Sequence, residues 1–218
     1  MTWSLVAGCS QCAQSSHSQF VVSAKDSGLP SKISMVKGIR GPRAASLGWV
    51  LPSRTDSGAI VQRVYIETTF VSYLTARPSR DLIVAGHQQI THDWWDNRRG
   101  DYDLCVSQLV IQEAGDGDAQ AAQERLAVLA TMTLLDIKEE AVSLAEALVQ
   151  AGALPAKAEN DALHIAVAAV HRVPYLLTWN CRHMANATMR AQIENVCASK
   201  GLKAPIICTP EEMMETKP

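Results

Sequence analysis

The sequence predicts an α/β fold in which a central parallel sheet of four to five strands lies between two layers of helices. Two observations favour this three-layer class. Between residues 61 and 218, short β-branched or apolar runs alternate with segments of helical periodicity. The apolar runs are continuous rather than alternating, as expected for strands that are covered on both faces.

The first part of this region predicts a strand followed by two helices. Residues 61–66 form a β-branched and aromatic run that is typical of a strand. Thr68 and Thr69 then offer hydroxyl caps for a helix that continues to about residue 74. Ser79 is expected to cap a longer helix over residues 80–98, where apolar side chains recur at helical spacing.

The middle of the region repeats the alternation. A second strand is predicted at residues 103–107, followed by a helical segment at 108–114. Asp118 is expected to cap a helix over residues 119–131. A third strand is predicted at residues 134–137.

The last part predicts three more helices and two more strands. Helical periodicity covers residues 139–151, 158–170 and 188–199. Continuous apolar runs at residues 175–178 and 205–208 predict the last two strands.

Length and composition restrict the class of protein. The chain has 218 residues, of which 47% are hydrophobic and 19% charged, enough for one domain with a buried core. No window approaches the roughly 18 uninterrupted apolar residues that a membrane-spanning helix requires. The six cysteines lack the dense spacing of a disulfide framework, so we expect reduced thiols and a cytoplasmic location.

Residues 1–60 differ from the rest in charge and composition. They hold six basic and two acidic residues, a net charge of +4 in a chain whose total is −2. The segment is rich in Ser, Gly and Pro and keeps no helical or strand period, so it cannot offset its ordering entropy by burial. We therefore expect residues 1–60 to be a disordered or non-native extension, with Met35 as one internal start, and residues 61–218 to be the folded domain.

Two local patterns in this extension resemble functional motifs but lack a required part. Residues 6–9 imitate a lipoprotein cleavage site, but no basic segment precedes them and the apolar stretch is shorter than the roughly 7 residues required. Cys9, Cys12 and His17 offer three soft metal ligands without the second pair that zinc sites of this spacing need.

Four polar side chains are expected to meet at one edge of the sheet. Glu67 follows the first strand and Asn180 lies two residues past the fourth, at the carboxyl ends where ligands bind in such sheets. Glu113 and Asp161 can reach the same edge from helices, and Asp161 shares an apolar helix stripe. Burying an unpaired carboxylate is costly, and a hard divalent cation such as Mg²⁺ or Mn²⁺ relieves that cost.

Four short motifs lie at these positions: Val64–Thr69, Ser107–Glu113, Asn160–Ala166 and Leu177–Asn180. Each is weak alone, but their order and spacing resemble those of the PIN-domain ribonucleases, and more narrowly the VapC-like toxins of bacterial toxin–antitoxin systems. The resemblance covers about residues 61–215. It implies a PIN-like nuclease domain that acts as a metal-dependent endoribonuclease.

The resemblance also implies roles for individual residues. The family's four acidic positions, which bind the cation and carry catalysis, fall on Glu67, Glu113, Asp161 and Asn180. The hydroxyl positions that orient these carboxylates fall on Thr69 and Thr178. Mg²⁺ or Mn²⁺ would activate water for in-line displacement, leaving a 5′-phosphate and a 3′-hydroxyl. The implied partners are an RNA substrate, a small antitoxin protein and a second copy of the chain.

Two departures from the family pattern keep an alternative open. Glu67 is one methylene longer than the usual Asp, and Asn180 is neutral where a charge is common. At most three charged ligands remain, so a second cation site is weakened. The alternative is a catalytically impaired PIN domain that binds RNA or a partner protein.

Ordinary structural explanations exist for each residue taken singly. Asp161 at a helix start is favoured by the macrodipole, and Glu113 fits a solvated helix. His164 is interpreted as a partly buried helix residue without a site role, and the pair Trp94–Trp95 as packing rather than RNA stacking. Arg182, close to Asn180, is the best-placed basic residue for an RNA phosphate, and an ordinary surface charge explains it nearly as well.

Two other enzyme classes are disfavoured. An aspartyl-phosphate enzyme needs a nucleophilic Asp at a strand end, whereas the first strand ends at Glu67 and Asp136 is expected inside its strand. A dinucleotide-binding domain needs a Gly-x-Gly-x-x-Gly motif after the first strand, and the sequence has none there. No feature of the sequence identifies the RNA target.

Overall fold

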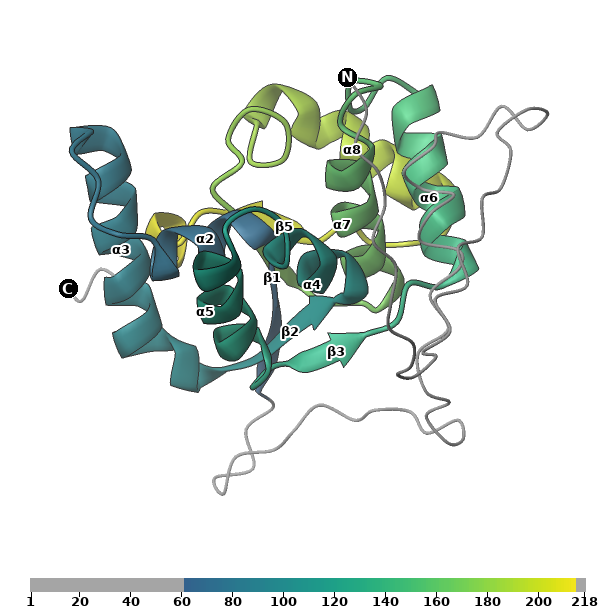
Figure 1. Cartoon of the computed structure of the whole chain (residues 1–218). Helices are drawn as coiled ribbons and strands as arrows, with labels where there is room; N and C mark the ends of the chain where they lie inside the picture. Colours follow the sequence, from purple (N-terminus) through teal and green to yellow (C-terminus); the bar gives the residue numbers. More distant parts are fainter. Residues whose placement is uncertain (1–60, 215–218) are drawn as a thin grey trace, which may run out of the picture.

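A computed structural model describes residues 61–214 and confirms the predicted α/β class (Figure 1). Five strands form one parallel sheet in the order β3-β2-β1-β4-β5. The strands are β1 (Gln62–Ile66), β2 (Tyr102–Ser107), β3 (Thr133–Leu135), β4 (Tyr175–Leu177) and β5 (Ile206–Cys208). The expected extension, with its two local patterns, lies outside the described residues.

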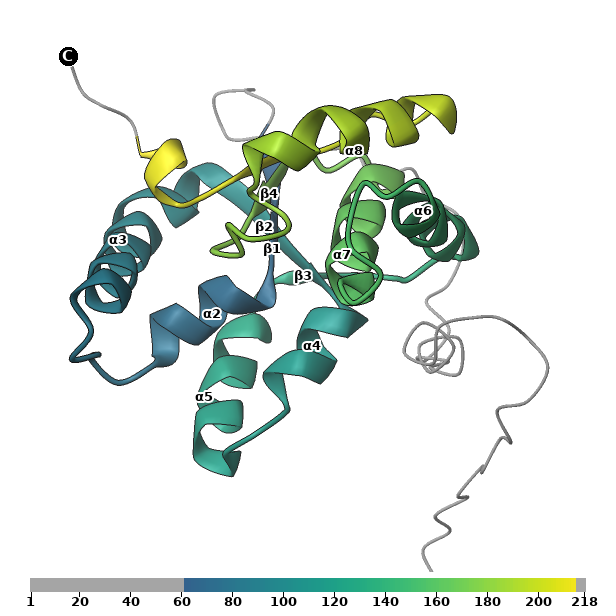
Figure 2. The same ribbon diagram turned by 90° about the horizontal axis from the view of Figure 1, so that it is seen from above.

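Helices cover both faces of the sheet. They are α2 (Thr68–Thr75), α3 (Leu82–Arg98), α4 (Gln108–Ala114), α5 (Ala119–Leu129), α6 (Glu139–Gln150), α7 (Glu159–Val170) and α8 (Ala187–Ser199), with short 3₁₀ helices η1 (Arg99–Asp101) and η2 (Glu211–Met213). Helix α2 contacts α3, α4 and α5, whereas α6 contacts α7 and α8. Figure 2 shows α2 and α3 on one side of β1 and α6 and α7 on the other.

The core is built on β1, the central strand. Tyr65 and Ile66 of this strand are fully buried, as is Leu176 of the neighbouring β4. Phe70 packs edge-on against Trp94, with ring centroids 5.4 Å apart. Burial of each such large side chain contributes roughly 1.5–3 kcal/mol, so the apolar runs of the sequence account for the stability of the sheet. Trp94 is wholly buried, as its predicted packing role requires.

The helix caps differ in two places from the predicted ones. Asp118 caps α5 as predicted, accepting a hydrogen bond from Ala121 N at 3.0 Å. Helix α3 begins at Leu82 and is capped by Asp81, because the Ser79 hydroxyl instead accepts a bond from Asp81 N. Helix α2 is capped by Glu67, whose carboxylate displaces the expected Thr68 and Thr69 hydroxyls from this role.

The third strand is shorter than predicted, and Asp136 lies just beyond it rather than inside. The pairing of β3 with β2 ends at Ser107 and Leu135, because β2 itself ends there and offers no further partner. The exposed Asp136 carboxylate accepts a hydrogen bond from Gln108 Nε2 at 3.0 Å. It is thus engaged in joining β3 to α4 at the sheet edge.

Parallel pairing brings the carboxyl ends of the strands to one edge, which positions the site. The Glu67 backbone N–H donates to Leu177 O at 3.1 Å, and the Thr178 N–H donates to Cys208 O at 3.0 Å. The residues that follow β1 and β4 are therefore fixed side by side. Among the described helices, none combines the length and apolar character needed to cross a bilayer.

Candidate metal centre

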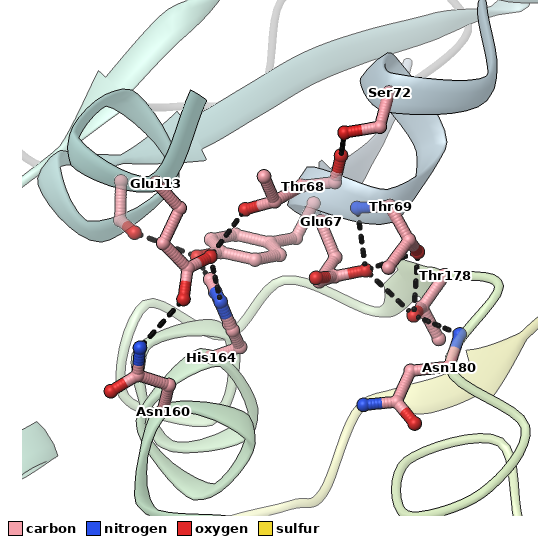
Figure 3. A network of polar contacts seen from close by, with 11 residues as sticks. Glu67, Thr68, Thr69, Ser72, Glu113, Asn160, His164, Thr178 and Asn180 are labelled. Carbon is pink, nitrogen blue, oxygen red and sulfur yellow. Dashed lines mark hydrogen bonds and ion pairs between the residues drawn. The ribbon is translucent and has the colours of Figure 1, made fainter. Parts of the chain in front are cut away.

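Glu67 lies at the junction of β1 and α2 with its carboxylate held in place by three hydrogen bonds (Figure 3). Its Oε2 accepts from the Thr69 backbone N at 3.0 Å, from Thr69 Oγ1 at 2.5 Å and from Thr178 Oγ1 at 2.8 Å. The residue is only 4% exposed. Its Oε1 accepts no hydrogen bond from any residue in the range 61–214, so one oxygen remains available to a ligand.

Glu113 approaches the same point from α4, and both of its oxygens are hydrogen bonded. Oε2 accepts from Thr68 Oγ1 at 2.5 Å and lies 3.1 Å from His164 Nε2, while Oε1 accepts from Asn160 Nδ2 at 2.7 Å. Burial alone would raise the pKa of Glu113, but its bond and charge interaction with His164, with the bonds from Thr68 and Asn160, lower the pKa to about 2. Glu113 is therefore a carboxylate at neutral pH.

His164 is a functional candidate that the sequence prediction missed. It is buried in α7 rather than partly exposed, with Nε2 facing Glu113 and Nδ1 lying 2.8 Å from the Tyr65 hydroxyl. Burial would lower the pKa of His164, but the hydrogen bond and negative charge of Glu113 outweigh burial and raise it. A signal did exist: His164 follows Asp161 by three positions, which places the two on one helix face.

A buried hydroxyl pair supports the imidazole from behind. The Tyr65 hydroxyl lies 2.7 Å from Ser107 Oγ as well as 2.8 Å from His164 Nδ1. Burial raises the pKa of Tyr65 well above its ordinary value, so the phenol is neutral. Strands β1 and β2 and helix α7 are thus joined beneath the site through polar side chains.

Asp161 and Asn180 form a second group, joined through His183. Asp161 Oδ2 lies 3.0 Å from His183 Nδ1, and the His183 backbone N–H donates to Asn180 Oδ1 at 3.1 Å. Thr178 links this group to the first, because its Oγ1 accepts from Asn180 N at 2.9 Å while donating to Glu67. Hydrogen bonds therefore join three of the four predicted ligands, Glu67, Asn180 and Asp161. Glu113 belongs to a separate hydrogen-bonded group with His164, which meets the first where one of its oxygens lies within 4.8 Å of one of Glu67.

The two hydroxyls predicted to orient the acids both contact Glu67. Thr69 Oγ1 also accepts a hydrogen bond from the Trp179 backbone N at 2.8 Å, so the loop after β4 is tied to α2. Arg182 is exposed, and its backbone oxygen accepts a hydrogen bond from Asn186 Nδ2 at 2.9 Å. Contact of Arg182 with RNA stays a prediction.

Glu67, Glu113 and His164 are suited to holding a cation. One ligand atom from each lies within 4.8 Å of the others, which is close enough for a single ion to contact all three. The carboxylates, with the amide of Asn180 nearby, supply the oxygen ligands that Mg²⁺ and Mn²⁺ accept. The donor set therefore fits the predicted type of cofactor.

Comparison with known proteins gives similar structures but no similar sequences. No protein-family profile matches the chain. No curated protein matches it either.

Three solved structures are similar to the chain. One is VapBC2 from Rickettsia felis bound to a promoter DNA fragment, with 14% identity and a TM-score of 0.45, covering 68% of this chain and 98% of that chain. A toxin–antitoxin complex from Klebsiella pneumoniae has 17% identity and a TM-score of 0.44, with coverages of 67% and 97%. VapC20 from Mycobacterium tuberculosis, a sarcin–ricin loop cleaving toxin, has 14% identity and a TM-score of 0.44, with coverages of 57% and 95%. The structures similar to this chain thus include VapC toxins, the class that its motifs resemble.

Proposed function

We propose that this chain is a metal-dependent endoribonuclease of the VapC-like toxin class, with its active site at Glu67, Glu113, Asp161 and Asn180. The observation that carries the proposal is the buried Glu67 carboxylate, which keeps one oxygen unpartnered beside Glu113. A negative charge buried in this way requires a compensating cation. Mg²⁺ or Mn²⁺ at this point is the simplest source of that charge.

The protein's own contribution is to hold the oxygen ligands in position before the cation arrives. Thr69 and Thr178 fix the Glu67 carboxylate, and Thr68 and Asn160 fix that of Glu113. When bound, the cation would activate water and stabilise the charge that develops on the scissile phosphate. We expect products with a 5′-phosphate and a 3′-hydroxyl.

The remaining residues of the network bear on substrate and charge. The side chains of Asp161 and His183 are 18% and 16% exposed, and that of Glu113 is 24% exposed, so both parts of the site are accessible from solvent. Arg182 is exposed in the same loop as Asn180 and is proposed to contact an RNA phosphate. The proposal also includes a protein antitoxin and a homodimer, which the motif resemblance predicts, and a cytoplasmic location, which the spacing of the cysteines predicts.

One observation favours the alternative of an RNA- or protein-binding domain with impaired catalysis. Asp161 pairs with His183 and Asn180 is neutral, so this half of the site offers a single carboxylate, one oxygen of which already contacts an imidazole. A single cation at Glu67 and Glu113 would then be retained without efficient turnover. An RNA cleavage assay separates the two functions.

The test is RNA cleavage by the full chain. Purified protein is incubated with a mixed RNA pool and Mg²⁺ or Mn²⁺, and the ends of any products are identified. We expect Asp161→Ala and Glu67→Gln to reduce cleavage at least roughly hundredfold, because each removes a charge that stabilises the transition state. EDTA should abolish it.

Glu194→Gln is the matched control, because Glu194 is exposed on α8 outside the network and should leave cleavage unchanged. Cleavage that survives EDTA or Asp161→Ala would refute the proposal. If the folded wild type cleaves nothing, calorimetric titration with Mn²⁺ decides: binding that Asp161→Ala weakens supports the impaired domain, and no binding excludes both functions.

A further inference from the structure

The imidazole of His164 lies among the atoms that would surround the cation. Its Nε2 is 3.1 Å from Glu113 Oε2, and one Glu67 oxygen completes a group within 4.8 Å. The three side chains come from the end of β1, from α4 and from α7. No local sequence pattern brings them together, so their convergence is a property of the tertiary structure.

A second observation points to a ligand at this place. Glu67 is more than nine-tenths buried, and its Oε1 has no hydrogen-bond donor within residues 61–214. Figure 3 shows this oxygen turned toward Glu113 and His164. A carboxylate group that is largely removed from water is energetically unfavourable unless a positive group faces it, and this oxygen is the one still open to such a group.

The surroundings of the ring permit Nε2 to act as a metal ligand. Nδ1 faces the Tyr65 hydroxyl, which can either donate or accept a hydrogen bond. A cation that replaces the Nε2 proton leaves the Nδ1–H donating to Tyr65. The Tyr65 hydroxyl then donates to Ser107 Oγ, 2.7 Å away. Histidines that bind metals commonly donate their other N–H in this way.

We infer that His164 Nε2 is a direct ligand of the bound cation, together with Glu67 and Glu113, and that Tyr65 orients the ring for this role. The inference rests on the proposed function and deepens it, since it concerns the identity of the ion. Imidazole nitrogen suits transition-metal ions better than Mg²⁺, which prefers oxygen and retains its waters. The site therefore selects Mn²⁺ over Mg²⁺.

The experiment detects the nitrogen ligand directly. The full chain is labelled with ¹⁵N-histidine and loaded with Mn²⁺, and electron spin-echo envelope modulation records coupling of the ion to nitrogen. We expect coupling in the wild type and in His183→Gln, and its loss in His164→Gln. Mutation of a residue that hydrogen-bonds a metal ligand typically weakens metal affinity roughly 10- to 100-fold. Tyr65→Phe should therefore weaken Mn²⁺ binding tenfold or more. Its effect on Mg²⁺ affinity should be smaller.

His183→Gln is the matched control, since His183 is the other imidazole of the network. Bound Mn²⁺ without nitrogen coupling in the wild type would overturn the inference and leave the nuclease proposal standing. Coupling that disappears in His183→Gln would overturn it as well. If His164→Gln does not fold, the wild type, His183→Gln and Tyr65→Phe decide the question, and a folded chain that binds no Mn²⁺ excludes both proposals.

Discussion

Removal of the Tyr65 hydroxyl should destabilise the protein far more than the loss of one oxygen atom suggests. This oxygen contacts Ser107 Oγ at 2.7 Å and His164 Nδ1 at 2.8 Å, and all three residues are almost completely buried. In Tyr65→Phe the ring and its packing are preserved. Ser107 and His164 each lose a partner that water cannot replace.

The expected cost follows from the two groups left unpaired. An unsatisfied buried polar group costs about 1–3 kcal/mol, so the two groups together should lower the free energy of unfolding of Tyr65→Phe by roughly 2–6 kcal/mol. With an m-value of about 2 kcal/mol/M, the urea midpoint falls by roughly 1–3 M. In the double variant Tyr65→Phe/Ser107→Ala, one unpaired group is removed along with its partner. Its cost should therefore be at least about 1 kcal/mol below the sum of the single costs.

The assay is equilibrium urea unfolding in EDTA, followed by circular dichroism. Tyr175→Phe is the matched control, because Tyr175 lies on the neighbouring strand and its hydroxyl makes no side-chain hydrogen bond to the described part of the chain. It should change stability by less than about 0.5 kcal/mol. A Tyr65→Phe cost as small as that of the control, or strictly additive costs in the double variant, would refute the buried network.

Three further predictions concern other parts of the structure. Burial lowers the pKa of His171, and this effect exceeds that of the opposing hydrogen bond to the Asp136 carbonyl. As the pH falls, the unfolded chain therefore binds a proton at His171 before the folded chain does. Its contribution to stability is therefore complete above pH 6.5 and is lost as the pH falls below it, and urea midpoints of wild type and His171→Gln should converge between pH 8 and pH 5. Trp179→Phe should cost about 1 kcal/mol in urea unfolding, since it removes the 2.7 Å bond from the indole N–H to Thr91 but keeps an aromatic ring against His87; a neutral effect would contradict that bond. Peptide mapping after native alkylation should find Cys181 modified before the three buried thiols, whose pKa values burial raises: Cys105, Cys197 and Cys208. Early labelling of any of these three would show that the core opens.

Most elements could be predicted from periodicity, but their ends could not. Apolar runs and helical spacing locate each strand and helix because burial is repeated along the chain. The end of β3 depends instead on its partner, since β2 offers no pairing beyond Ser107. The start of α3 depends on two competing caps, and the Asp81 carboxylate accepts from two backbone N–H groups, Ile83 and Val84.

The candidate site could be predicted in part for the same reason. Glu67 and Asn180 follow strands, so parallel pairing alone brings them to one edge of the sheet. The spacing of His164 from Asp161 is only a weak signal of its role, because a histidine on an apolar helix face is ordinarily a core residue. Its orientation depends on Tyr65, which lies 99 positions away and whose polar end the strand pattern does not reveal.

The order of strands in the sheet also determines when the site can exist during synthesis. The Glu67 carboxylate is held by Thr178, 111 positions later, and β1 pairs with β4 only after α7 has been made. A nascent chain that ends at α6 contains Glu67 and Glu113 but neither Asp161 nor His164. Such long-range closure is slow and comes late in folding. If the chain cleaves RNA, the ribosome that makes it is therefore exposed to an active nuclease only when translation of the domain is nearly finished.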